Sequence, residues 1–202
     1  MRYLITHSLL SSWLYTIKEN PYEDMTTERD PMAEFMLALR REPTPMTDAI
    51  QNGIDFEDLV TAVVYGRADG TEPWYEAAAK IAGRIRGGVL QYKASKRVVI
   101  DGTVFVLHGR LDCLKAGEIT DIKFTKSYDP GKFFHSTQHP MYFELVPEAN
   151  RFTYLVSNGS GVWSETYRRD ETKSIIPYIQ DFMSWIKTMG LLELYQAKWG
   201  AK

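Results

Sequence analysis

The chain has few of the residues that build several common kinds of site. Its 202 residues include one cysteine, Cys113, which excludes an intramolecular disulfide and any zinc or iron–sulfur site made from several cysteines. No apolar run approaches the roughly 18 residues that a membrane helix needs. A glycine-rich phosphate loop and a Ser/His/Asp pattern are also missing, so nothing indicates a P-loop NTPase or a triad hydrolase. We therefore expect a cytoplasmic protein with no membrane segment.

The charge is nearly balanced. There are 24 Lys and Arg against 26 Asp and Glu, a formal net charge of −2 with His neutral. Such a chain has no global attraction to nucleic acid or acidic membranes, so any polyanion site must be local. Hydrophobic residues at 44% and charged residues at 25% are ordinary for a globular protein. The length fits one domain, 1–202, with a sizeable core.

The hydrophobic spacing changes along the chain from a helical to a strand-like period. Helices are predicted at residues 8–18, 31–41, 47–65, 72–86, 134–146 and 173–189. Strands are predicted at residues 89–94, 97–100, 103–112, 118–125, 151–157 and 161–168, with a short strand as an option at 3–6. The order predicts an α/β (α+β) domain with a central mixed β-sheet flanked by helices. Residues 1–88 are expected to be the mostly helical part and 89–202 the sheet-containing part.

Two short turns predict β-hairpins, at Asp101-Gly102 and at Ala116-Gly117. If the second is a two-residue loop, Asp112 on one strand lies opposite Asp121 on the next. Cβ atoms of such pairs are about 4.5–5.5 Å apart, where like charges are destabilising. Strand alternation also places Lys123 on the face of Asp121.

Two interpretations of this patch are open. In the first, the face is solvated and water screens the charges. In the second, the patch holds a hard divalent cation, because Mg²⁺ prefers a few carboxylates with waters and phosphate oxygens. Lys123 would then orient or deprotonate an attacking water. Neighbours such as Ile119 and Ile122 indicate half-buried or buried strands, where an unpaired carboxylate is costly, and this favours the cation.

Four segments carry a family resemblance. The segments GRLD (109–112) and DIK (121–123) resemble the core of the PD-(D/E)XK nuclease superfamily, where an acidic residue precedes a (D/E)-x-K triplet on the next strand. QHPMY (138–142) resembles the Q-x-x-x-Y motif of the RecB-like, phage-type exonuclease branch. GIDFE (53–57) resembles the upstream G-x-x-x-H or G-x-x-x-E element of that branch. The four segments follow the family's order.

The resemblance implies a restriction-endonuclease-like core and a metal-dependent DNA exonuclease that hydrolyses phosphodiester bonds in phage or prophage recombination or in DNA repair. One or two Mg²⁺ or Mn²⁺ ions would be held by Glu57, Asp112, Asp121 and the backbone carbonyl of Ile122. Asp112, Asp121 and Lys123 would be the catalytic residues.

Further residues are candidates for contact with DNA. Gln138 and Tyr142 lie on one helical face, where they could contact the DNA strand or orient the metal-binding carboxylates. The loop after the active-site strand adds three more candidates: Lys126, Lys132 and His135. Structural explanations remain for some of these residues, with Tyr142 as a core aromatic and Glu57 as a solvated helix carboxylate.

Two other functions remain alternatives. One is a structure-specific or restriction-type DNA endonuclease with the same site. The other is a nuclease-fold DNA-binding or recombination protein with weak catalysis. DNA is the expected partner in every case, and a single-strand annealing or recombination protein is a further candidate. A homo-oligomer is also compatible with the resemblance, because processive relatives can encircle DNA as rings.

Overall fold

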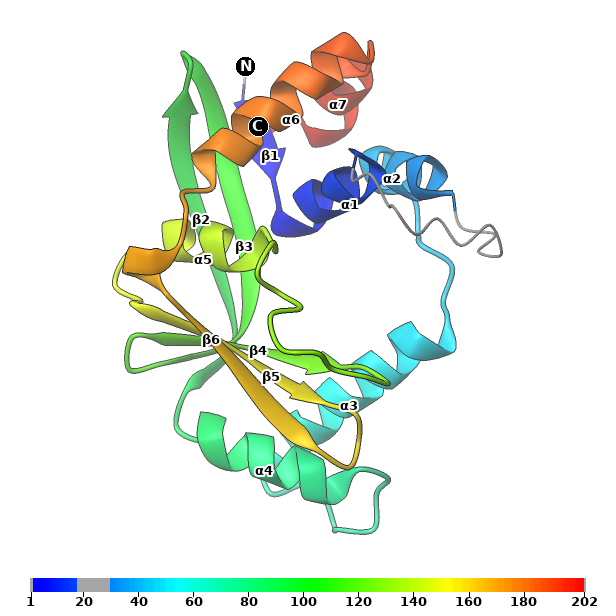
Figure 1. Cartoon of the computed structure of the whole chain (residues 1–202), viewed down its shortest axis with the longest axis vertical. Coiled ribbons are helices and arrows are strands. Elements are labelled where there is room, and N and C mark those ends of the chain that lie inside the picture. Colours follow the sequence, from blue (N-terminus) through cyan, green and yellow to red (C-terminus); the bar gives the residue numbers. More distant parts are fainter. Residues whose placement is uncertain (1, 18–29, 202) are drawn as a thin grey trace.

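The structure of the chain is a computed structural model that describes residues 2–17 and 30–201. A six-stranded sheet runs through its centre (Figure 1). The strands are β1 (Arg2–Ile5), β2 (Val89–Ile100), β3 (Thr103–Lys115), β4 (Glu118–Phe124), β5 (Arg151–Ser157) and β6 (Val162–Arg168). β1 pairs with β3 and β4 with β5 in parallel, whereas the other pairs are antiparallel. The predicted α/β fold with a central mixed sheet, flanking helices and a helical N-terminal region is confirmed.

Helices cover both faces of the sheet (Figure 1). They are α1 (His7–Ile17), α2 (Pro31–Arg40), α3 (Asp48–Val64), α4 (Tyr75–Ile85), α5 (Gln138–Leu145), α6 (Ile176–Thr188) and α7 (Leu192–Trp199), with a short 3₁₀ helix at Arg169–Glu171. One buried cluster joins the sheet to α1, α2, α5, α6 and α7. A second joins α3 and α4 to three buried sheet residues, Cys113, Ile122 and Leu155.

Local chemistry explains where two of the N-terminal helices begin. The Asp30 side chain accepts hydrogen bonds from the backbone N–H groups of Met32 and Ala33 at 2.9 and 3.1 Å, with Pro31 in the first turn. Thr47 caps α3 in the same manner, because its hydroxyl accepts from the Ile50 N–H at 3.3 Å. The predicted starts of these two helices are confirmed. The predicted end of the first helix, at Lys18, lies outside the described residues.

Two predicted strand or helix boundaries were wrong in the middle of the chain. The strands predicted at 89–94 and 97–100 form one strand, β2. Its ladder continues through Ser95 and Lys96, which pair with His108 and Leu107. The Ser95 hydroxyl also donates to the Leu107 carbonyl, and Lys96 forms a 2.6 Å ion pair with Glu144. The helix predicted from residue 134 begins only at Gln138, since a proline at 140 is compatible only with a first turn.

Two other helix boundaries also differ from the prediction. α4 begins at Tyr75 instead of residue 72, because the Glu72 carboxylate closes a turn by accepting from the N–H groups of Asp69 and Gly70. The helix predicted at 173–189 begins at Ile176 instead of residue 173, and the Ser174 hydroxyl accepts a hydrogen bond from the Ile176 N–H at 3.2 Å. Its predicted end is confirmed, because Gly190, with a φ of 68°, stops the helix, and a separate helix, α7, follows.

The C-terminal helix holds the first strand in place. The Tyr195 hydroxyl donates to the Leu4 carbonyl at 2.9 Å, and the Gln196 amide donates to the Tyr3 hydroxyl at 3.0 Å. The Ala201 N–H donates to the Arg2 carbonyl at 2.9 Å. Residues about 190 positions apart in sequence therefore position β1, which leads directly into α1.

None of the helices in the described part of the chain is both long enough and apolar enough to cross a membrane.

Candidate active site

β3 has different neighbours along its two edges. β2 pairs with it on one edge over nearly its whole length. The other edge is shared, because β1 pairs with residues 104–107 and β4 with residues 113–115. Residues 108–112 therefore have no described strand partner on this shared edge. The candidate residues gather at this opening.

The Ala116-Gly117 turn sets the predicted register. Lys115 pairs with Glu118 and Cys113 with Thr120, and the β3–β4 ladder ends there. Beyond that point, Oδ2 of Asp112 accepts a hydrogen bond from the backbone N–H of Ile122 at 2.7 Å. The Asp112 carboxylate thus takes the place of the next backbone hydrogen bond between β3 and β4. The register of the hairpin places Asp112 opposite Asp121 at this position.

The two aspartates lie close together, and Asp112 is in an environment that disfavours its charge. Asp121 is 3% exposed. Burial, followed by the negative charges of Asp121 and Glu57, raises the pKa of Asp112 well above its usual value. The like-charge conflict that the hairpin predicts is therefore present in the folded chain.

Asp121 is the best-connected acid of the group. Its Oδ1 accepts a hydrogen bond from the Gln138 side-chain amide. The Lys123 ammonium lies 2.7 Å from Oδ2 and forms an ion pair with it. The positive charge of Lys123 offsets the cost of burying this carboxylate.

Lys123 is an ammonium under ordinary conditions. Burial alone would lower its pKa, but the charge and hydrogen-bonding capacity of Asp121, with the charges of Asp112 and Glu57, outweigh burial and raise the pKa above its usual value. In this structure Lys123 is therefore a donor and a positive charge, and not a base.

Glu57 approaches the group from α3. Its Oε1 accepts a hydrogen bond from the Gln91 side-chain amide at 2.7 Å. Its charge is close enough to act on both Asp112 and Lys123. Gly53, one turn earlier in α3, has open space where a Cβ would lie, so close packing does not require a glycine there.

Gln138 and Tyr142 lie inside the protein, at 4% and 2% exposure. Gln138 contacts Asp121, as described above. The Tyr142 hydroxyl donates to the Arg110 carbonyl at 2.9 Å. Arg110 lies in the stretch of β3 that has no partner on the edge shared by β1 and β4. The Tyr142 ring fills the space beside Gly109, where an added Cβ would lie 2.5 Å from Cε1. In this structure both residues support the site from within and do not present a surface to DNA.

The loop between β4 and α5 leaves its basic residues accessible. Glu165 on β6 fixes this loop, because its carboxylate accepts from the Tyr128 hydroxyl at 2.7 Å and from the N–H groups of Gly131 and Phe133 at 3.1 and 3.2 Å. Lys126, Lys132 and His135 are exposed on it.

Sequence reasoning missed two residues near the site. His7, at the start of α1, packs edge-on against the Tyr142 ring with centroids 5.4 Å apart, and burial lowers its pKa to about 4. The second is Gln91, the partner of Glu57. A lone histidine and a lone glutamine carry no spacing signal, so only the tertiary fold could reveal them.

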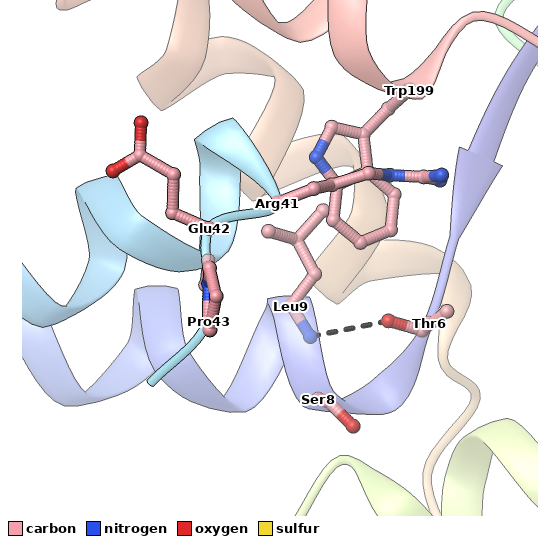
Figure 2. Close-up of a pocket in the computed structure, with 8 residues that line it drawn as sticks. Thr6, Ser8, Leu9, Arg41, Glu42, Pro43 and Trp199 are labelled. Carbon is pink, nitrogen blue, oxygen red and sulfur yellow. Dashed lines mark hydrogen bonds between the residues drawn. The ribbon is translucent and has the colours of Figure 1, made fainter. Parts of the chain in front are cut away.

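Figure 2 shows a pocket of about 400 Å³ beside the start of α1. Thr6 and Ser8, which flank His7, line it together with Arg41 and Trp199. The Arg41 guanidinium lies 4.2 Å from the centre of the Trp199 ring. The carboxylates of the candidate site, Asp112, Asp121 and Glu57, do not line this pocket.

Side-chain ligands alone do not complete a metal centre here. Within residues 2–17 and 30–201, no group of three or more His, Cys, Asp or Glu side chains is arranged to hold a metal ion. Mg²⁺ commonly binds through one or two carboxylates and keeps several waters, and Asp112 and Asp121 could supply such a pair.

The comparisons with known proteins concern the fold. No protein-family model and no curated protein sequence matches this chain. The chain is similar to a solved structure titled "Crystal structure of SSO0001", with a TM-score of 0.56 and 13% identity, over 90% of this chain and 76% of that one. It is also similar to Rai1 of Scheffersomyces stipitis, with a TM-score of 0.36 and 13% identity, over 92% of this chain and 61% of that one. At this identity, the similarity to the first structure indicates a shared fold alone.

Proposed function

We propose that this chain is a DNA nuclease that uses Mg²⁺ or Mn²⁺ to hydrolyse phosphodiester bonds, and that it acts as an exonuclease. One observation carries the proposal. Asp112, Asp121 and Lys123 converge where β3 and β4 separate, and the buried carboxylate of Asp121 is held by Gln138 and Lys123.

The donor set fits a hard divalent cation. Asp112 and Asp121 supply a pair of carboxylates, Glu57 is a third candidate ligand, and hard cations of this size prefer oxygen. The backbone carbonyl of Ile122 is the fourth candidate ligand. A cation bound there would lower the pKa of a coordinated water and stabilise the negative charge that develops on the phosphate. It would also offset the burial and the repulsion by neighbouring acids that together raise the pKa of Asp112.

The chain's own residues have separate tasks in this proposal. Gln138 holds Oδ1 of Asp121, so that carboxylate keeps one orientation. The Lys123 ammonium donates to the attacking water or to a phosphate oxygen, because it stays protonated beside three acids. Tyr142 holds the open edge of β3 through the Arg110 carbonyl.

The accessible basic residues supply a contact for the DNA backbone. Lys126, Lys132 and His135 would bind phosphates, which positions a strand without reading its sequence. The exonuclease form, a role in phage recombination or repair, a single-strand annealing or recombination partner and a homo-oligomer rest on the resemblance of the four segments to RecB-like nucleases.

The test is cleavage of end-labelled linear DNA and of closed circular DNA, each with Mg²⁺, with Mn²⁺ and with EDTA. We expect cation-dependent loss of the linear DNA and survival of the circle. Asp121→Asn and Lys123→Ala should each lower the rate by about 100-fold or more, the contribution typical of a group that acts on the transferred proton or the charge in the transition state. Lys115→Ala is the matched control, because exposed Lys115 donates to the Arg84 carbonyl outside the candidate site.

Each other result has a defined meaning. Nicking of the closed circle would replace the exonuclease with an endonuclease that uses the same site. Tight DNA binding without cleavage in either cation would support a DNA-binding or recombination protein instead. Full activity in both site variants would refute the site assignment.

A further inference from the structure

The ladder between β2 and β3 is interrupted at one position. Leu90 pairs with Cys113 and Tyr92 with Leu111, but Gln91 and Asp112, which lie between these pairs, are not paired. One residue lies between these two pairs on each strand, so neither strand has an extra residue. The interruption therefore comes from the backbone conformation at the position across from Asp112.

Gln91 has a φ of 53°, in the left-handed region. Five non-glycine residues in the described part of the chain have a positive φ. Arg41 and Trp74 lie at helix ends, and Asp101 and Ala116 lie in hairpin turns. Gln91 lies inside a strand, where no turn requires this conformation. Strain of this kind concentrates at functional sites, because the surrounding structure must maintain it.

The Gln91 side chain reaches from the edge strand to the third acid of the site. Its Nε2 donates to Oε1 of Glu57 at 2.7 Å. A carboxylate that accepts this bond requires the amide nitrogen, and not the amide oxygen, to face it. Oε2 of Glu57 receives no hydrogen bond from the residues that the structure describes, so one carboxylate oxygen is fixed and the other is available.

We propose that Gln91 is a positioning residue, which holds Glu57 so that its Oε2 can join Asp112 and Asp121 when they bind a divalent cation. This inference rests on the proposed function, because it assigns a task within that metal site. The left-handed backbone places the amide toward α3, and the hydrogen bond limits the rotation of the Glu57 carboxylate. Partners of this kind orient metal ligands, and their loss typically weakens metal affinity by about 10- to 100-fold.

The experiment measures Mn²⁺ affinity of the full chain without DNA, by the electron paramagnetic resonance signal of free Mn²⁺. Gln91→Leu removes the amide and keeps the bulk of the side chain. Gln91→Gly removes the amide and also relieves the backbone strain, so it gives a folded variant even if Gln91→Leu does not fold. Ala116→Gly is the control, because it relieves a similar left-handed φ of 48° in a turn and breaks no side-chain hydrogen bond.

We expect both Gln91 variants to bind Mn²⁺ about 10- to 100-fold more weakly, and Ala116→Gly to bind as the wild type does. Unchanged affinity in the Gln91 variants would overturn the inference. A double-mutant cycle gives a second decision, because Gln91→Leu should have no further effect in a Glu57→Ala background. A further loss of the same size in that background would show that Gln91 does not act through Glu57.

Asp121→Asn separates this inference from the proposed function. If the wild type binds Mn²⁺ much more tightly than Asp121→Asn, but the Gln91 variants bind as the wild type does, only the proposed role of Gln91 is overturned. Equal affinity of the wild type and Asp121→Asn would overturn the metal site itself, and the inference with it.

Discussion

The two hairpins built on β3 have nearly the same turn but different ladders. Asp101 and Gly102 have φ of 49° and 74°, and Ala116 and Gly117 have φ of 48° and 77°. Both are two-residue turns with two left-handed residues, the type that matches the twist of paired strands. The β2–β3 ladder extends from Ile100 to Val89, whereas the β3–β4 ladder stops after three pairs.

The difference shows that the turn and the ladder are determined separately. Each turn sets the register of its hairpin from local chemistry. The Asp112 carboxylate then ends the second ladder by taking the Ile122 N–H. The chain loses regular pairing next to Asp112 on both sides, since Gln91 interrupts the β2–β3 ladder at the same position. The proposed role of Asp112 as a metal ligand would account for this loss, because departures from regular structure concentrate at functional sites.

The largest effect should follow from Asp112→Asn. The variant should lose more than about 100-fold in cleavage rate, because changes that only reorient a metal ligand already cost about 10- to 100-fold. Its free energy of unfolding should rise at neutral pH. The pKa of Asp112 is raised in the folded chain, so the folded state binds more protons than the unfolded state above the ordinary Asp pKa, and wild-type stability falls as pH rises toward the folded pKa.

Urea unfolding of wild type and Asp112→Asn at several pH values measures this difference. The advantage of Asp112→Asn should be smallest in acid and should grow as the pH rises. An advantage that is constant with pH would show that the Asp112 carboxylate is not strained by burial and by its neighbours. Asp101→Asn, at the regular hairpin, should change neither the activity nor the pH profile.

A smaller effect should follow from Gly109→Ala, in the stretch of β3 that has no partner on the edge shared by β1 and β4. The added Cβ would lie 2.5 Å from Cε1 of Tyr142 and 3.0 Å from Cδ1 of Leu145. Overpacking of a buried position typically costs about 1–3 kcal/mol, and chemical unfolding measures it. Gly53→Ala is the contrasting variant, because its Cβ would enter open space in α3 and a helical alanine is favoured. If Gly109→Ala and Gly53→Ala lowered the free energy of unfolding equally, this would contradict the close packing of the Tyr142 ring beside Gly109.

The smallest effects should come from the turns themselves. Gly102→Ala and Gly117→Ala each place a Cβ in the left-handed region, at a cost of roughly 1 kcal/mol. Similar losses of stability are expected, since the two turns have similar conformations. Cleavage and Mn²⁺ affinity should fall in Gly117→Ala more than in Gly102→Ala, because the second turn sets the register that brings Asp112 to Asp121. Equal effects on affinity would remove the functional difference between the hairpins.

Local sequence patterns predicted the parts of the fold that depend on neighbouring residues. The turns at Asp101-Gly102 and Ala116-Gly117, the helix starts at Pro31 and after Thr47, and the mixed sheet follow from such patterns. The approach of Asp112 and Asp121 followed from turn register, which is also local.

The parts that depend on distant contacts could not be predicted in the same way. The Asp112 carboxylate ends the β3–β4 ladder through a contact that strand alternation cannot show. Tyr142 was a candidate for DNA contact, but it is buried because Gly109 leaves room for its ring. His7 reaches the site because α1 follows β1, which pairs with β3 about 100 residues later in the chain.

The attachment of α7 to β1 also has a consequence for the order of folding. β1 receives hydrogen-bonding partners from residues 195–201, and β1 carries His7 toward Tyr142. During synthesis, chain segments become available from the N-terminus onward. β1 and the start of α1 must therefore wait for residues 195–201 to leave the ribosome before their final contacts can form. The His7 side of the candidate site is thus assembled late, although His7 is made long before residues 195–201.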